Sequence, residues 1–598
     1  MRKLDTIAEI VRKAESDYQN GNTQISEYVT FSLKENISRI DAYLNSKHIS
    51  GETDSQGREK PFFNIVTAAV NIWYRATDID RKNIRIKATS SDKYMLAFLA
   101  TIHLQEFMRK AAFGTFLNEW GRSLARYGSS VLKFVEQGGE LIAEVVPWNR
   151  LICDSIDFEN NVKIEKLYFT PAQLRRKAGY NKDMVEQLIE SATTTRKNLA
   201  LSTQKDNKSD YIEVYEVHGE LPLSYITEDD KDDDTYVQQM HVVSFVATNP
   251  GSGKYTDYCL YSGRESRDPY MITHLIKEEG RTQAIGAVEN LFEAQWMVNH
   301  TAKTIKDQLD LASKLIFQTS DGNLVGRNLL SSLENGDILI HSKNEPLTAV
   351  DNSSQDITAL QAFGQQWQAL GAQINGISEA MMGANPPSGT AWRQTQALLQ
   401  ESHSLFELMT ENKGLAIEEM MRKYIIPHLK KKMDTSEEIT ATLDSYQIKE
   451  IDSRFVPKEA VRIHNDLIKK DILSGKIAEQ PDLEKLKETV QEAQAAFGNQ
   501  RFIKPSSVKT KTWKDVLKDF EWEVEVEVTN EQVDKQVVMD TLNTALQVVV
   551  NPQFAQNPQA QLIISKILAE TGVVSPLEFS MERPAPVVPG PLPAPVPA

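Results

Sequence analysis

The fold is decided by the stretch AIGAVENLFEAQWMVNHTAKTIKDQLD, residues 284–310, in which apolar side chains recur every three or four positions. One face of an α-helix repeats with this spacing, so the stretch predicts a single amphipathic helix of about seven turns. The stripe that defines the face consists of Ile285, Val288, Phe292, Gln295, Val298, Ala302, Ile305 and Leu309.

A second helix of the same kind is predicted over residues 354–379. Its stripe consists of Ile357, Leu360, Phe363, Trp367, Leu370, Ile374 and Ile377. At about 1.5 Å per residue, each helix would be roughly 38 Å long. The intervening residues 311–353 hold short apolar runs separated by turn residues, which predicts a compact β-like segment. Glycines at 286, 364, 371 and 376 would allow the helices to approach closely.

The loop AMMGANPPSG, residues 380–389, follows the second helix and is rich in glycine and proline. Residues 390–433 then predict a very long helix. Because some forty residues is long for a helix of a globular protein, we expect a kink at Gly414.

Upstream, residues 1–48 predict a helical arm, and residues 49–283 predict a mixed α/β region. Within this region, Ser130–Phe134 and Leu141–Val146 flank Gly138-Gly139 and predict a hairpin. Thr170 is expected to cap a short helix that has Pro171 as its first residue. We predict one long helical stretch over 92–127.

Downstream, residues 434–580 are mostly polar and helical in pattern. EWEVEVEV, residues 521–528, alternates strictly and predicts a strand with one acidic and one apolar face. Residues 581–598 are rich in proline, so we expect them to be extended and disordered.

The composition excludes several classes of protein. The chain has 598 residues, a net charge of −16 and 40% hydrophobic residues, which is typical of a globular protein with more than one structural unit. Its two cysteines, Cys153 and Cys259, exclude a multi-cysteine zinc module and a disulfide framework. We expect no signal peptide and no membrane span. The acidic balance argues against gripping nucleic acid over the whole surface, but is compatible with DNA sliding past.

We find no convincing catalytic motif. NPGSGKY, residues 249–255, resembles part of a phosphate-binding loop, but Thr248 stands where the first glycine belongs and Tyr255 where a serine or threonine belongs. A turn between strands explains it better. The acidic residues 228–234 lack the spacing of a calcium loop and predict a solvated hairpin tip. Lys430–Lys432 would sit at a helix C-terminus, where cations are favourable. We therefore expect no enzymatic activity, no cofactor and no metal.

The order of these elements resembles the portal proteins of tailed bacteriophages. Two further stretches are similar to the wing of that family, namely ARYGSSVLKF at residues 125–134 and VPWNRLICD at residues 146–154. The resemblance covers about residues 60–530. It implies an α+β, predominantly helical portal fold. The parts would be an N-terminal arm (1–48), wing (49–283), first stem helix (284–310), clip (311–353), second stem helix (354–379), tunnel loop (380–389), long kinked helix (390–433), wing return and crown (434–580) and tail (581–598).

The resemblance also implies a function. Portal proteins form a ring, usually of twelve subunits, at one vertex of the capsid, and double-stranded DNA is packaged and ejected through its channel. The implied partners are other copies of the chain, DNA bound without sequence preference, the terminase large subunit, the major capsid and scaffold proteins, and a head-completion or tail adaptor. The implied location is the virion, after assembly in the host cytoplasm.

Site residues follow from the same resemblance. The tunnel loop would face DNA with Met381, Met382, Gly383, Ala384, Asn385, Pro386, Pro387 and Ser388. The clip would dock the terminase or the adaptor with Asp321, Asn323, Arg327, Glu334 and Asp337. Lys303, Lys306 and Lys314 are candidate DNA contacts, and ion pairing with Asp307, Asp310 or neighbours is the alternative role for them.

Two other classes remain open. A non-enzymatic helical scaffold or adaptor would use the same long helices to bind protein partners and would form an elongated, low-order oligomer. An NTP-dependent enzyme would use residues 249–255, with Lys254 at its centre.

Overall fold

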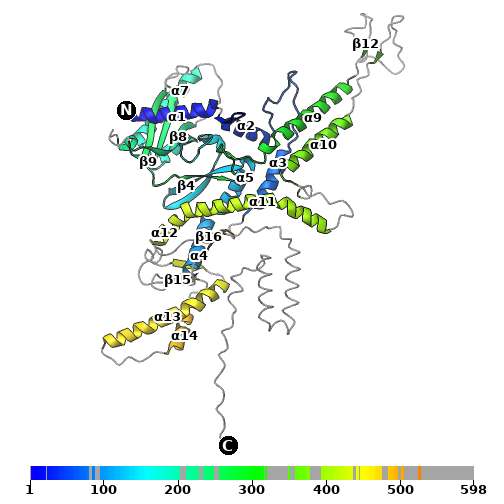
Figure 1. Cartoon of the computed structure of the whole chain (residues 1–598). Helices are drawn as coiled ribbons and strands as arrows, with labels where there is room; N and C mark the ends of the chain where they lie inside the picture. Colours follow the sequence, from blue (N-terminus) through cyan, green and yellow to red (C-terminus); the bar gives the residue numbers. More distant parts are fainter. Residues whose placement is uncertain are drawn as a thin grey trace, which may run out of the picture. The chain divides into compact units, whose positions relative to one another are not determined.

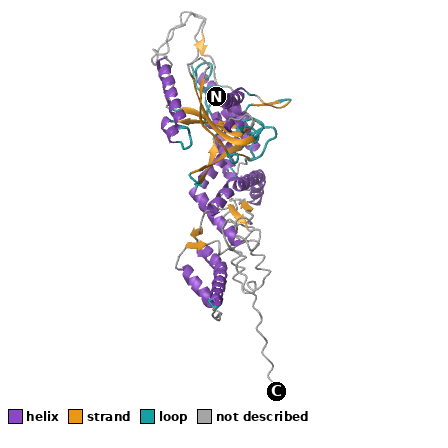
Figure 2. Cartoon of the chain, turned by 90° about the vertical axis from the view of Figure 1, so that its left-hand side faces the viewer, coloured by secondary structure: helices purple, strands orange, loops and turns teal. Residues whose placement is uncertain are grey.

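The structure is a computed structural model of the whole chain. It describes residues 2–21, 23–79, 84–87, 94–201, 211–227, 234–247, 255–314, 317–318, 348–349, 357–377, 381, 392–434, 439–442, 445–474, 482–495, 500–503 and 523–526. The chain divides into two units, Met1–Val526 and Glu527–Ala598, and every described residue belongs to the first. Helices and strands are mixed, so the fold is α+β (Figures 1 and 2).

The N-terminal arm is not helical throughout. It consists of α1 (Arg2–Asn20), the hairpin β1 (Thr23–Ser26) and β2 (Val29–Phe31), and α2 (Leu33–Leu44). The prediction of helix over 28–31 was wrong because Val29, Thr30 and Phe31 favour a strand. Ser32 then starts α2, since its hydroxyl accepts a hydrogen bond from the backbone N–H of Glu35.

The next helices are α3 (Val66–Ala76), α4 (Tyr94–Lys110) and α5 (Phe113–Tyr127), with the short strand β3 (Ile84–Lys87) before α4. The single helical stretch predicted over 92–127 is therefore two helices. Ala112 adopts a left-handed backbone conformation with φ 50° and separates them. Alanine is an excellent helix former, so local propensity gave no sign of this break.

Two antiparallel sheets form the centre of the α/β region (Figure 1). The five-stranded sheet has the order β10-β9-β8-β7-β6 and comprises β6 (Leu151–Ile152), β7 (Lys163–Phe169), β8 (Ile212–Pro222), β9 (Tyr236–Ala247) and β10 (Tyr255–Arg264). The three-stranded sheet has the order β11-β4-β5 and comprises β4 (Ser129–Gln137), β5 (Glu140–Val146) and β11 (Tyr270–His274). The predicted hairpin is confirmed as β4 and β5, with the turn at Gly138-Gly139.

Short helices connect these strands. They are the 3₁₀ turn Trp148–Arg150, α6 (Pro171–Arg176), α7 (Lys182–Leu201) and α8 (Ser224–Thr227). Thr170 caps α6 as predicted and forms a reciprocal capping box with Gln173, and Pro171 is the first helical residue.

Residues 249–254 lie outside the described residues, as do most of 228–234. Their flanking strands are nevertheless informative. Tyr255 begins β10, which pairs antiparallel with β9, so residues 248–254 connect two neighbouring antiparallel strands. A phosphate-binding loop leads from a strand into a helix, and this one leads into a strand.

The second half of unit 1 begins with the 3₁₀ turn Glu289–Leu291 and α9 (Phe292–Ala312), and continues with β12 (Phe317–Gln318), β13 (Thr348–Ala349) and α10 (Ile357–Ile374). Then come α11 (Trp392–Met420), a π-helical turn (Met421–Ile425), α12 (Ile426–Asp434), β14 (Ile439–Thr442), α13 (Ser445–Leu473), α14 (Leu483–Ala495), β15 (Gln500–Ile503) and β16 (Glu523–Val526). β14 pairs with β15.

The predicted alternating strand is confirmed as β16, which pairs antiparallel with β3. The register places Val524 opposite Ile86 and Val526 opposite Ile84. Both isoleucines are buried, and both valines pack against the main hydrophobic core. The two strands of this small sheet, β16 and β3, therefore come from opposite ends of unit 1 in the sequence.

The long helix continues through Gly414 without a break, and the kink at that glycine stays a prediction. Its irregularity is the π-helical turn at Met421–Ile425, directly before Pro427. Because proline has no N–H, the carbonyl of Lys423 loses its helical partner, and Arg267 donates a hydrogen bond to that carbonyl instead.

A buried lysine joins the two sheets. The Nζ atom of Lys133 on β4 lies 2.7 Å from an Oε2 of Glu165 on β7 and 2.6 Å from an Oε2 of Glu216 on β8. Burial alone raises the pKa of Glu216, but contacts with His218 and Lys133 outweigh burial and lower the pKa to about 2. Tyr270 on β11 also donates a hydrogen bond to Glu165.

We predict that Lys133→Met lowers the free energy of unfolding by about 3–5 kcal/mol, because it removes the ammonium group that pairs with both buried carboxylates. Chemical denaturation measures this loss. The triple variant Lys133→Met/Glu165→Gln/Glu216→Gln should recover most of it. Equal destabilisation of the single and triple variants would contradict the ionic explanation.

A second buried lysine lies under the long helix. Lys413 of α11 is 1% exposed, and its Nζ atom donates a hydrogen bond to the carbonyl of Thr77 at 2.8 Å. Burial lowers the pKa of Lys413 to about 8. Between about pH 8 and the ordinary lysine value of about 10.5, the unfolded state therefore binds more protons than the folded state at this position.

Stability should consequently rise with pH in that window. We predict that the free energy of unfolding of the wild type, relative to Lys413→Met, increases by about 2 kcal/mol from pH 7 to pH 10. Urea denaturation of both proteins across this range gives the difference. A difference that does not change with pH would show that Lys413 titrates normally.

Candidate functional site

The first feature of interest is the antiparallel helix pair, by which we mean α9 and α10 (Figure 1). Gly364 faces Thr301, and Gly371, seven residues later, faces Leu291 and Ala294. The contacts therefore run in opposite directions along the two helices. Beyond the helix pair, β12 and β13 pair antiparallel, Phe317 with Ala349 and Gln318 with Thr348. The chain thus leaves through one helix and returns through the other.

The helix of residues 284–310 begins at Phe292, eight residues later than predicted. Residues 284–287, which precede α9, instead contact the α/β region through their backbone N–H groups. The N–H of Ala284 donates to Oγ of Ser129 at 2.7 Å, and the N–H of Ala287 donates to the carbonyl of Ala125 at 3.1 Å. A Cβ at Gly286 would lie 2.5 Å from the carbonyl oxygen of Arg126, so only glycine fits this contact.

Two side-chain amides anchor α9 to residues 63–65, which directly precede α3. Gln295 is fully buried; its Oε1 accepts the N–H of Ile65 at 3.0 Å, and its Nε2 donates to the carbonyl of Phe63 at 2.7 Å. Oδ1 of Asn299 accepts the N–H of Phe63 at 2.9 Å. We call these two residues the amide anchor. It fixes the position of α9, because each unmade bond would leave a buried polar group without a partner.

The end of α10 is equally well defined. Gly376 has φ 66°, and the N–H of Ile377 donates to the carbonyl of Ala372 at 2.9 Å, which is the pattern of a Schellman cap. Asn375 is fully buried, and its Nδ2 donates to the carbonyl of Ala287 at 3.1 Å. The ends of both helices therefore contact each other near residue 287.

The lysines proposed as DNA contacts are engaged within the chain. Nζ of Lys303 lies 2.5 Å from Oδ2 of Asp307 and 3.5 Å from Oδ2 of Asp54. Nζ of Lys306 donates to the carbonyl of Glu59 at 3.0 Å. Lys314 lies just beyond α9 and also interacts with a neighbouring group. The contacts of Lys303 therefore agree better with the ion-pairing role than with a contact to a DNA phosphate.

The other site predictions fall mostly on residues that the structure does not describe. These are Met382, Gly383, Ala384, Asn385, Pro386, Pro387, Ser388, Asp321, Asn323, Arg327, Glu334 and Asp337. Met381 is the exception. It is half-buried and packs against the main hydrophobic core.

Lys431 and Lys432, in the last turn of α12, pair with the β4–β5 hairpin. Lys431 lies 3.2 Å from Glu136, and Lys432 lies 2.5 Å from Glu140. This arrangement agrees with a structural role at a helix end better than with a nucleic-acid patch.

The helix pair exposes large apolar side chains. Trp296 is 52% exposed, Leu309 50% and Ile374 59%, and Leu311, Phe363 and Leu370 are also exposed. Large apolar groups gathered on one pair of helices indicate a surface that another molecule covers.

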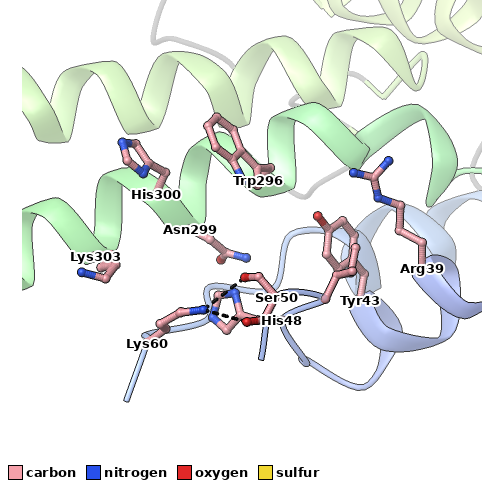
Figure 3. A pocket seen from close by; sticks show the side chains of 10 residues that line it. Arg39, Tyr43, His48, Ser50, Lys60, Trp296, Asn299, His300 and Lys303 are labelled. Carbon is pink, nitrogen blue, oxygen red and sulfur yellow. Dashed lines mark hydrogen bonds between the residues drawn. The ribbon is translucent and has the colours of Figure 1, made fainter. Parts of the chain in front are cut away.

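A pocket of about 410 Å³ lies beside the base of α9, between this helix, the end of α2 and the loop that follows it (Figure 3). Its lining contains three permanent cations, two histidines and no carboxylate. The lining residues are Arg39, Tyr43, His48, Ile49, Ser50, Lys60, Trp296, Asn299, His300 and Lys303. Of these residues, the sequence pointed only to Lys303. The residues from 39 to 60 come from segments more than 200 positions away, and Trp296, Asn299 and His300 share α9 with Lys303 but form no recognisable ligand motif with it.

A larger cavity of about 1060 Å³ lies between the two sheets and includes Lys133, Glu165 and Glu216. The ammonium of Lys133 already occupies the position between the two carboxylates. Within the described residues, no group of three or more His, Cys, Asp or Glu side chains could hold a metal ion. Nor, among the helices described, is there one with the length and apolarity that crossing a bilayer requires.

Comparison with known proteins adds no relative. No family model matches the chain, and no curated protein matches it. Function must therefore be argued from the geometry described above.

The glycines of α10 provide a test of the helix pair. A Cβ at Gly371 would lie 2.9 Å from Leu291 and 3.1 Å from Ala294, whereas a Cβ at Gly364 would find Thr301 at an ordinary 3.4 Å. Both substitutions gain the same helix propensity. We predict that Gly371→Ala is less stable than Gly364→Ala by about 1–3 kcal/mol, because only the former overpacks the contact. Thermal or chemical unfolding measures the difference in stability between the two variants. Equal stabilities would contradict this packing of α9 against α10.

Proposed function

We propose that the chain is a phage portal protein. It forms a ring at one vertex of a capsid, with the twelve subunits usual in that family, and double-stranded DNA passes through the channel of the ring. The observation that carries the proposal is the antiparallel helix pair, which leaves the α/β region through α9, reaches the β12–β13 pairing and returns through α10. This is the order of stem, clip and stem that the resemblance implies.

The firmly held base of the helix pair supports the same assignment. A channel wall must keep its position while DNA moves past it. The amide anchor and the contacts of residues 284–287 with residues 125–129 join α9 to the α/β region through hydrogen bonds in which a backbone N–H donates to a side-chain or backbone oxygen. Such bonds leave little freedom for the helix to rotate or slide.

The charge also suits a channel. Twelve copies with a net charge of −16 would give a formal charge of −192 for the ring. A predominantly acidic channel repels phosphate, so DNA passes without being held. The pairing of Lys303 with Asp307 and Asp54 agrees with this, since it removes a cation that would otherwise retain DNA.

On this proposal, the remaining roles follow those of the family. The chain has no enzymatic activity and no cofactor. Its partners are the terminase large subunit, the major capsid and scaffold proteins, and a head-completion or tail adaptor, and its location is the virion. Asp321, Asn323, Arg327, Glu334 and Asp337 would serve the clip, and residues 381–388 the tunnel loop.

A helical scaffold or adaptor is the second candidate. The exposed apolar side chains of α9 and α10 support an adaptor as much as a portal. They indicate a surface that another molecule covers, and that molecule could be a second copy of the chain or a different protein. The two functions differ in stoichiometry. A portal closes into a ring of many copies, whereas an adaptor forms a small, elongated assembly.

We predict that Ile374→Glu weakens self-association at least about tenfold, because a charge at a covered apolar position is buried without a partner. Gln368→Glu is the matched control. It adds the same charge to an exposed position of α10 outside the Phe363–Leu370–Ile374 stripe, and should leave assembly unchanged. Sedimentation velocity of the two variants and the wild type provides the comparison. Identical sedimentation of all three proteins would show that Ile374 of α10 does not lie in the subunit interface.

A further inference from the structure

We propose that the pocket at the base of α9 binds the phosphate ester of a ligand whose organic part carries a flat ring, such as a nucleotide. The inference rests on the pocket alone and not on the portal function. Three features of the pocket support it: its positive charge, a fixed hydrogen-bond donor and the shape of its lining.

The first feature is charge. Nζ of Lys60 donates only to neutral acceptors, namely the carbonyl and hydroxyl oxygens of Ser50 and the carbonyl of Gly51, at 2.8–3.3 Å. Arg39 lies over the ring of Phe292 with its Cζ atom 4.7 Å from the ring centre. Neither Lys60 nor Arg39 forms an ion pair with any residue described in the structure. Two positive charges therefore face the pocket uncompensated, in a chain that is otherwise acidic.

The second feature is the amide of Asn299, which is 6% exposed and lies in the middle of the lining (Figure 3). Its Oδ1 accepts hydrogen bonds from the N–H of Phe63 at 2.9 Å and from Nε2 of Gln295 at 3.1 Å. An atom that accepts from two donors must be the oxygen, so the orientation of the amide is settled. Its Nδ2 is thereby left as a donor on the pocket side, held in place before any ligand arrives.

The third feature is shape. The rings of Trp296 and His300 stack with centroids 5.3 Å apart and an angle of 5° between their planes, and Trp296 is 52% exposed. Because each ring covers one face of the other, the exposed ring of Trp296 forms the aromatic wall of the pocket. The volume of about 410 Å³ lies in the usual range for small-ligand pockets and is much larger than a bare phosphate ion needs. Cations beside an exposed aromatic wall are the combination that recognises a nucleotide unit.

A nucleotide unit has two sources, a free nucleotide and a strand of DNA. Isothermal titration calorimetry on the full-length protein distinguishes them with three probes: adenosine monophosphate, inorganic phosphate and a short DNA duplex. We expect saturable binding of adenosine monophosphate that is tighter than that of inorganic phosphate. Binding of the duplex that is lost in the pocket variants below would assign the site to DNA. Binding of adenosine monophosphate without the duplex would assign it to a free nucleotide.

Two variants locate the site. Asn299→Asp keeps the oxygen that accepts from Phe63 and replaces the donor with a carboxylate, so it should weaken binding by roughly tenfold or more. Arg39→Gln makes no change to the amide anchor and should have a similar effect, which keeps the test valid if Asn299→Asp folds poorly. The control is Arg122→Gln, which removes the same charge from an exposed position of α5 and should bind like the wild type.

The proposal is overturned if neither adenosine monophosphate nor the duplex binds saturably. It is also overturned if Arg39→Gln binds as the wild type does. Assembly measured on the same samples keeps this result separate from the portal function, because Arg39→Gln should assemble normally whichever way the binding experiment turns out.

Discussion

The amide anchor is the interaction on which the rest of the account depends. Gln295 and Asn299 lie one turn apart on α9, and their side-chain amides bind the backbone N–H and C=O groups of Phe63 and the N–H of Ile65. Without these bonds, α9 would be held to the α/β region mainly by apolar contacts, which permit rotation and sliding. With them, the direction in which α9 projects is defined. The same amide of Asn299 also faces the pocket, so one residue links the position of the helix to the chemistry at its base.

The proposed ring would cover apolar side chains that the single chain leaves exposed on the helix pair. The apolar stripe of this pair divides between side chains that pack inward, such as Phe292 and Val298, and side chains that stay exposed, such as Leu309, Phe363 and Ile374. Covering one large apolar side chain contributes about 1.5–3 kcal/mol. Several such residues per subunit would supply a substantial driving force for association. The polar contacts at the base of the pair fix its geometry, and on the proposed function the exposed apolar side chains along its length would form the contacts between subunits.

Much of the fold could be predicted from local pattern. The periodicity of the two long helices, the glycines of the β4–β5 turn, the cap at Thr170 and the alternation at Glu523–Val526 are signals carried by neighbouring residues. The errors arose where long-range contacts outweigh that pattern. Residues 284–291 have helical spacing, but Ala287 binds the backbone of Ala125. Gly414 lies inside the uninterrupted helix α11, whereas the irregularity begins at Met421, six residues before Pro427.

The candidate site was less predictable than the fold. Lys303 was predicted because the resemblance makes residues 284–310 a stem helix, but its pairing with Asp54 brings together residues about 250 positions apart. Arg39, Lys60 and Asn299 carry no local motif, and only tertiary packing places them around one pocket. Gln295 stood in the predicted apolar stripe, and its burial was foreseen, whereas its bonds to Phe63 and Ile65 could not be.

The central claim is that this chain closes into a ring. The most direct measurement is the mass and shape of the purified protein, by mass photometry together with negative-stain imaging. The account predicts rings of about twelve subunits, near 12 × 67.5 = 810 kDa, with a central hole. An elongated particle of a few subunits without a hole would contradict the account and favour the adaptor.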